Sequence, residues 1–124
     1  MKEKRPHRVP LPDRALEILE ELKKDRSGPF VFHSSSAEGF ISDMSLWSVL
    51  RKLEVADQMT VHGLRTSFRT WAAERTKFPS EMAEMALAHQ VGSEVERAYQ
   101  RSDMMDRRFE LMQAWADHCA GCDE

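Results

Sequence analysis

The sequence predicts a mainly α-helical fold of five to six helices, with a short extended or β segment near the N-terminus. Apolar residues recur at spacings of three and four in several separate stretches, which is the pattern of amphipathic helices. Breakers such as Ser27-Gly28-Pro29 separate these stretches. At 124 residues the chain is long enough for one modest core and too short for two, so a single domain over 1–124 is expected.

The first third of the chain is expected to hold one helix between two extended pieces. Pro6 and Pro10 exclude helix, so residues 9–11 are predicted to be extended. A helix over 13–24 should follow, since Pro12 suits its starting turn. Its apolar face would consist of Leu16, Leu19 and Leu22. The apolar run at residues 30–32 predicts a short strand or extended segment.

A second helix is expected from Ser42, whose hydroxyl makes it a favourable N-cap. The side chains predicted to face the core are Leu46, Trp47, Leu50 and Leu53. Trp47 could instead stack on a nucleic-acid base, but an indole at helical spacing among leucines is far more often a core residue.

The remaining helices are expected at 64–75, from Pro79 or Ser80 to about 88, from about 93 to 99, and at about 103–119. The first of these should bury Leu64, Phe68, Trp71 and Ala72. The second should bury Met82, Met85 and Ala86. The last should bury Met105, Phe109, Met112, Ala116 and Cys119, with Trp115 beside them.

His62 and Arg65 stand at the start of the helix predicted at 64–75. Gly63 would allow a sharp turn there, and a helix start presents unpaired N–H groups and a positive dipole end. An imidazole, a guanidinium and free N–H groups at one point predict a phosphate-binding corner. His89 lies downstream, and Tyr99 is the only tyrosine in the chain.

The net charge of −3 argues against a generic nucleic-acid binder. Residues 110–124 carry four acids and no Lys or Arg, so the rest of the chain is close to neutral. Basic residues gather in an N-terminal arm, on the central helix and around Tyr99: Lys2, Lys4, Arg5 and Arg8; Arg65, Arg69, Arg75 and Lys77; Arg97, Arg101, Arg107 and Arg108. Such patches could bind phosphates weakly and with strong salt dependence.

The order His62-x-x-Arg65, His89, Tyr99, with the flanking residues 61–65 and 69–72, resembles the tyrosine recombinases, or phage integrases, of genomic islands and satellite phages. Nearly the whole chain can be aligned with the second half of their catalytic domain. The resemblance implies DNA recombination and integration with double-stranded DNA as substrate and other integrase protomers, in a tetramer, as partners. It implies no metal, no other cofactor and no small-molecule substrate.

The resemblance also implies a role for each residue. Tyr99 would attack the scissile phosphate and form a 3′-phosphotyrosyl link. Arg65 would clamp a non-bridging oxygen, His62 would accept the tyrosine proton or hold the phosphate, and His89 would bind the phosphate from the other side. Lys2 would protonate the leaving 5′-oxygen, with an ordinary solvated lysine as the alternative. The residues expected to contact DNA are Lys4, Arg5, Arg69 and Arg97.

The family's catalytic set contains a further arginine, upstream of a β-hairpin whose tip carries the catalytic lysine, and no counterpart of that arginine precedes Met1. We therefore expect the C-terminal part of an integrase catalytic domain, nearly inactive unaided, because losing one such charge lowers the rate by about 10²–10³-fold. The alternative is a non-catalytic DNA-binding or protein-docking remnant, which the acidic tail favours. An unrelated helical regulator is a third interpretation, which leaves the order of the four residues to chance.

Cys119 and Cys122 form a single C-x-x-C beside His118. Zinc sites generally need a second pair of ligands, so two reduced thiols and no metal are expected. No apolar run is long enough for a membrane helix, and no hydrophobic segment follows the N-terminal Met-Lys-Glu-Lys-Arg, so a cytoplasmic protein is expected.

Overall fold

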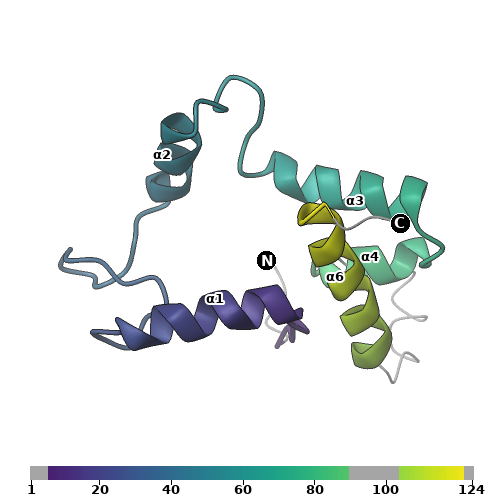
Figure 1. Cartoon of the computed structure of the whole chain (residues 1–124), viewed down its shortest axis with the longest axis horizontal. Helices are drawn as coiled ribbons and strands as arrows, with labels where there is room; N and C mark the ends of the chain where they lie inside the picture. Colours follow the sequence, from purple (N-terminus) through teal and green to yellow (C-terminus); the bar gives the residue numbers. More distant parts are fainter. Residues whose placement is uncertain (1–5, 90–103, 122–124) are drawn as a thin grey trace. The chain divides into compact units, whose positions relative to one another are not determined.

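A computed structural model describes residues 6–89 and 104–121, which contain five helices (Figure 1). These are α1 (Asp13–Lys24), α2 (Met44–Lys52), α3 (Gly63–Arg75), α4 (Ser80–Ala86) and α6 (Met105–Cys119). The prediction of a mainly α-helical fold is confirmed. Residues 6–12 form neither helix nor strand, and the helix predicted to reach Tyr99 lies outside the described residues. None of the helices in the described ranges is long and apolar enough to cross a membrane.

The chain divides into two compact units. The α1–α2 unit comprises Asp13–Thr66, and the three-helix unit comprises Met1–Pro12 together with Ser67–Glu124. The division falls near the start of α3, so most of that helix belongs to the three-helix unit.

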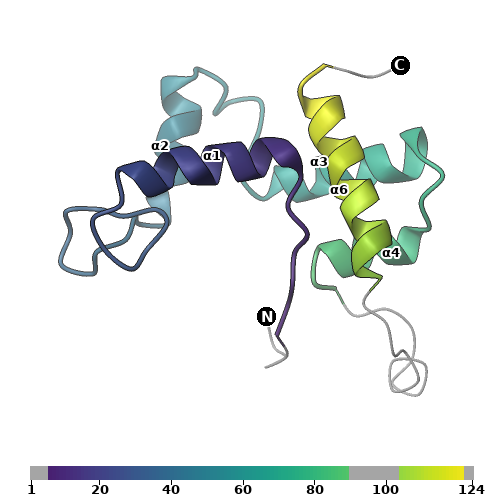
Figure 2. The ribbon, with the colours of Figure 1, turned by 60° about the horizontal axis from the view of Figure 1, so that its bottom comes forward.

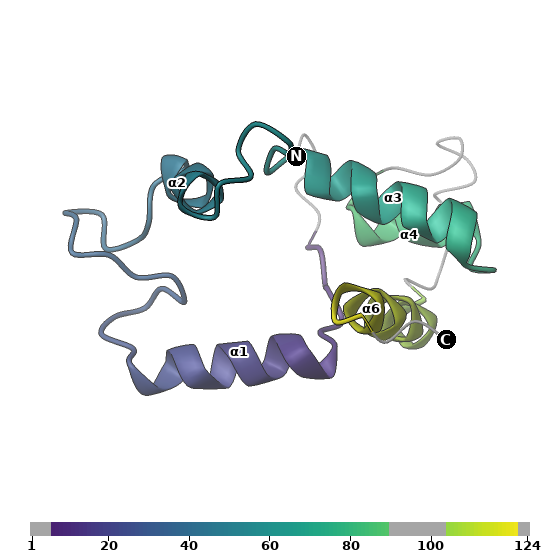
Figure 3. The same cartoon turned by 45° about the horizontal axis from the view of Figure 1, so that its top comes forward.

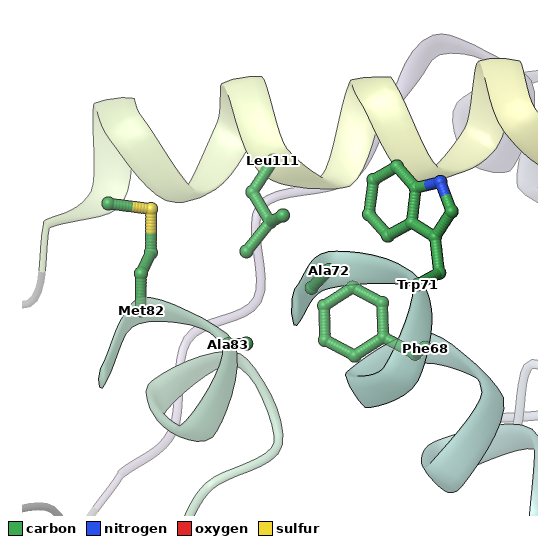
Figure 4. Close-up of a cluster of buried hydrophobic side chains, with 6 residues drawn as sticks. All are labelled: Phe68, Trp71, Ala72, Met82, Ala83 and Leu111. Atoms are coloured by element: carbon green, nitrogen blue, oxygen red, sulfur yellow. The ribbon is translucent and has the colours of Figure 1, made fainter. Parts of the chain in front are cut away.

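The hydrophobic core of the three-helix unit lies where α3, α4 and α6 meet (Figure 4). Leu111 of α6 points toward α3 and α4, and it is fully buried, as are Met82 and Ala83. The buried positions of α3 are Phe68, Trp71 and Ala72. The predictions for these three residues and for Met82 are thus confirmed. The prediction for Leu64 is wrong, because that side chain at the start of α3 is 48% exposed.

The buried face of α6 differs from the predicted one by about one residue. Arg108 and Leu111 are buried, and Met104 packs beside the core, as do Met112 and Trp115, which were predicted there. Phe109 and Cys119, also predicted to be buried, are exposed. Arg108 is only 2% exposed, and its Nη2 donates a hydrogen bond to the carbonyl oxygen of Arg8 at 2.7 Å. A guanidinium can be buried when a donor finds an acceptor, as Nη2 does here, so its charge did not force this position outward, although its Nε is buried without a hydrogen bond to any described residue. Arg108 is therefore a core residue rather than part of a phosphate-binding patch.

Aromatic stacking joins the last turns of α6 to α3. The His118 ring stacks on Trp71 and on Trp115, with centroid separations of 5.6 Å in both cases. Trp115 also meets Phe68 edge to face at 5.5 Å. Aromatic pairs at such distances add stability beyond the burial of their area. Figure 3 shows α6 beside α3 and α4, with the segment that precedes α1 passing next to α6.

The α1–α2 unit buries few apolar side chains. Leu50 is 7% exposed, whereas Leu46, Leu53 and Leu16 are exposed, and α1 has no buried residue. The inward positions predicted for α2 are therefore wrong except for Leu50. Trp47 is 41% exposed, and the Arg51 guanidinium lies 4.8 Å from its ring centroid as a cation–π pair.

Helix α2 also begins later than predicted. Its N-cap is Asp43, which makes no side-chain capping bond, and the Ser42 hydroxyl instead pairs with the Ser45 hydroxyl at 3.2 Å. Between α1 and α2 the chain folds back on itself (Figure 2). An isolated antiparallel bridge there joins His33 and Phe40. Residues 30–32 themselves form no strand, so the structure does not show the short strand predicted there.

Candidate phosphate-binding residues

The start of α3, with His62 and Arg65, is closed by a local cap. Thr60 Oγ1 accepts a hydrogen bond from the Gly63 N–H at 2.9 Å. The Leu64 N–H donates to the Val61 carbonyl and the Arg65 N–H to the His62 carbonyl, at 3.2 and 3.0 Å. The sequence predicted unpaired N–H groups here, and these three are already engaged. An anion at this point would therefore be held mainly by the side chains of His62 and Arg65.

Gly63 is needed for a close contact rather than for a sharp turn. The glycines with positive φ among the described residues are Gly39 and Gly121. A β-carbon on Gly63 would lie 3.0 Å from Thr60 Oγ1, which is tighter than nine in ten such contacts. Glycine thus allows the Thr60 hydroxyl to approach the helix start. His62 is exposed and Arg65 is half-buried, so this helix start has one accessible imidazole.

His89 is placed by the C-terminal cap of α4. The Ala88 N–H donates to the Met85 carbonyl at 3.0 Å, and the His89 N–H donates to the Glu84 carbonyl at 2.9 Å. Ala88 adopts the left-handed conformation with φ of 61°. This pair of bonds and this backbone turn define a Schellman motif. The motif reverses the chain and brings His89 back over Glu84.

One carboxylate joins two of the predicted site residues. Glu84 Oε1 lies 2.6 Å from Arg69 Nε, and Glu84 Oε2 lies 2.5 Å from His89 Nδ1. The side chains of Glu84 and Arg69 are 26% and 33% exposed, and that of His89 is 50% exposed. No role was predicted for Glu84. Arg69 was predicted to contact DNA, and in the structure it pairs with this carboxylate.

The Glu84 contact determines how the His89 ring can act. A carboxylate accepts hydrogen bonds only, so the contact is satisfied when Nδ1 carries a proton. Nε2 is then the ring nitrogen that Glu84 does not hold. With one ring proton Nε2 accepts a hydrogen bond, and with two it donates one, for example to a phosphate oxygen.

The other predicted site residues lie outside the described ranges. These are Tyr99, Lys2, Lys4, Arg5 and Arg97. Within residues 6–89 and 104–121, no group of three or more His, Cys, Asp or Glu side chains could hold a metal ion. Cys119 is exposed and forms no disulfide, whereas Cys122 is outside the described part of the chain.

Comparison with known proteins finds similarity to phage and prophage integrases. The model of the phage integrase family matches residues 1–105. Prophage integrase IntA of Escherichia coli is 39% identical over 119 residues, covering 94% of this chain and 29% of IntA. Prophage integrase IntZ of the same organism is 32% identical over 119 residues, with the same shares of both chains. The integrase of Shigella phage Sf6 is 30% identical over 120 residues, covering 94% of this chain and 31% of that protein. No solved structure matches the chain.

Proposed function

This chain belongs to the phage integrase family, and we propose that it carries most of the centre with which an integrase cleaves and rejoins DNA through a 3′-phosphotyrosyl link. The observation that carries this proposal is the family match over residues 1–105, which includes every residue of the ordered set His62, Arg65, His89 and Tyr99. The exposed His62 and the accessible His89 ring support it, because both imidazoles can reach a ligand.

The chemistry needs a nucleophile in line with the scissile bond, neutralised phosphate oxygens and a protonated leaving group. A phenol suits the first task, since its phosphate ester stays reactive toward a second hydroxyl. We assign this task to Tyr99, which displaces the 5′-oxygen and becomes bonded to the 3′-phosphate. The DNA bond energy is kept in this ester, so strand exchange needs no ATP.

Arg65 and the two imidazoles serve the phosphate. The planar Arg65 guanidinium can make two parallel hydrogen bonds to non-bridging oxygens and keeps its charge. His62 accepts the Tyr99 proton or donates to the phosphate. His89 donates from Nε2 when both of its ring nitrogens carry protons. Lys2 protonates the 5′-oxygen as it leaves. The expected DNA contacts outside this centre are Lys4, Arg5 and Arg97, and the expected place of action is the cytoplasm.

The chain spans about 30% of the length of the curated relatives that it matches. We therefore propose that cleavage requires groups that those relatives carry outside the matched region, including one more phosphate-binding arginine. Several copies would assemble on double-stranded DNA.

A second candidate function is protein docking without catalysis. The exposed apolar side chains of α2 favour it, since Met44, Leu46 and Val49 are each about half exposed. Under this hypothesis the chain would bind an integrase without forming a covalent bond to DNA.

A covalent-trapping assay separates the two functions. The full chain is mixed at low salt with the part of IntA that lies outside its match to this chain, and with a duplex carrying the IntA attachment sequence and a nick beside the scissile bond. The expected result is a protein–DNA adduct that survives denaturant and is absent with Tyr99→Phe. Binding of the IntA fragment with no adduct would refute the catalytic proposal and support docking.

A further inference from the structure

The carboxylate of Glu84 differs from that of an ordinary surface ion pair in its burial and in the number of its partners. It contacts Arg69 with one oxygen and His89 with the other, and its own side chain is about three-quarters buried. Exposed ion pairs usually add little stability. A carboxylate that makes two charge-assisted hydrogen bonds from a partly buried position restricts its partners more strongly.

The restraint on His89 comes from two levels of structure. The Schellman motif fixes the backbone, because the His89 N–H bonds to the Glu84 carbonyl at 2.9 Å. The Glu84 side chain then fixes the ring through Nδ1 at 2.5 Å. The backbone and the ring of His89 are therefore both anchored to Glu84.

Arg69 anchors the carboxylate from a different helix. Arg69 lies on α3 beside Phe68, and Glu84 follows Met82 and Ala83 on α4. Phe68, Met82 and Ala83 share one hydrophobic core, so α3 and α4 have a fixed separation. Because α3 and α4 are packed together, the Arg69 Nε contact at 2.6 Å restrains the Glu84 carboxylate. The carboxylate in turn restrains the His89 imidazole.

We propose that Glu84 is a positioning residue for the transesterification, and that Arg69 holds Glu84 rather than DNA. This inference depends on the proposed function, in which His89 binds the scissile phosphate. Glu84 holds the proton on Nδ1 and so directs the Nε2 edge toward the ligand. Because phosphate oxygens are acceptors, His89 must carry a second proton, taken from solvent, to donate to them.

The first test measures the ring itself and needs no DNA. In the full chain, long-range ¹H–¹⁵N NMR spectra of the histidine rings report which nitrogen carries the proton. Wild-type His89 is expected to be mainly the Nδ1–H form when it is neutral. Glu84→Ala should shift the population toward Nε2–H, and Glu84→Gln, whose amide oxygen can still accept, should keep Nδ1–H. Glu81→Gln, the same change at an exposed position on the same helix, should leave the His89 spectrum unchanged.

The second test measures adduct formation in the covalent-trapping assay. Misplacing a reacting or clamping group by about 1 Å can lower a rate by about 10²-fold. Glu84→Ala is therefore expected to slow adduct formation by about 10²-fold. Glu84→Gln is expected to slow it by about 10-fold, because the amide oxygen can still accept from Nδ1 while the NH2 group, a donor, replaces the oxygen that faces Arg69. Arg69→Gln should fall in the same range as Glu84→Gln, while Glu81→Gln should stay within twofold of the wild type.

The two tests separate the two proposals. A wild-type His89 ring in the Nε2–H form would overturn the positioning role, and so would unchanged adduct rates in Glu84→Ala. If the wild type forms no adduct while its ring shows the Glu84-dependent Nδ1–H form, the proposed function fails and the restraint on His89 stands. Circular dichroism checks that each variant is folded. If Glu84→Ala unfolds, the comparison of Glu84→Gln with Glu81→Gln decides the outcome.

Discussion

Ala88 adopts the left-handed conformation, φ 61°, at the position of the Schellman motif that most often holds glycine. Replacing it with glycine tests whether this backbone stores strain beside His89. A non-glycine residue in that region costs about 1–2 kcal/mol. Glycine also lowers the free energy of unfolding by about 0.4–1 kcal/mol, because it gives the unfolded chain greater conformational freedom. Losing a half-buried methyl group costs about 0.4 kcal/mol more, taking half the value for a fully buried group. Ala88→Gly should therefore raise the free energy of unfolding by about 0.5 kcal/mol.

The matched control is Ala73→Gly, an exposed position in the interior of α3. Glycine there should lower the stability by about 0.5–1 kcal/mol, since the helix conformation suits alanine better. Urea titrations in a Trp47→Phe background make Trp71 and Trp115, both in the three-helix unit, the fluorescence probes. The two variants should differ by about 1–1.5 kcal/mol at equal m-values. A loss of stability in Ala88→Gly as large as that in Ala73→Gly would refute the assignment of strain to Ala88.

Three further substitutions test the packing. Leu111→Ala, at the fully buried centre of the core, should cost about 3–5 kcal/mol in urea unfolding, whereas Leu111→Met should cost less than about 1.5 kcal/mol. Thr60→Ala removes the cap of α3, so it should lower the free energy of unfolding by about 1 kcal/mol and speed amide exchange at Gly63. Thr60→Ser should keep the hydrogen bond, and equal exchange rates in the two variants would contradict the cap. Arg108→Met should cost about 1–3 kcal/mol by leaving the Arg8 carbonyl without this donor. Trypsin should then cut faster after Arg8, as it should not in the exposed control Arg107→Met.

Helices were predictable here where local signals agree. The spacing of Phe68, Trp71 and Ala72 on α3 identified both the helix and its buried face. Pro12 marked the start of α1, and the observed bounds equal the predicted ones. Each of these signals lies within one turn of the chain, so no tertiary information was needed.

The predictions of buried helix faces were wrong where a buried charge or the absence of a covering neighbour determined which side chains are buried. The predicted face of α6 excluded Arg108 because arginine is rarely buried, yet the Arg8 carbonyl, 100 residues away, accepts its hydrogen bond. The inward positions on α2 failed for a different reason. Periodicity shows which side of a helix is apolar and not whether anything covers it, and Leu46 and Leu53 are exposed.

In the candidate site, too, some features depend on local sequence and others on tertiary packing. His62 and His89 were predicted from their order in the sequence, and both stand at helix ends whose caps are local: Thr60 before α3 and the left-handed Ala88 after α4. Glu84 was missed, although it lies five residues before His89, because its second partner, Arg69, is brought near only by the packing of α3 on α4. The backbone positions of the two imidazoles thus depend on local sequence, whereas the orientation of the His89 ring depends on the tertiary fold. A substitution in the core between α3 and α4 should therefore impair His89 chemistry without altering the caps, and cap substitutions should displace an imidazole while the core stays intact.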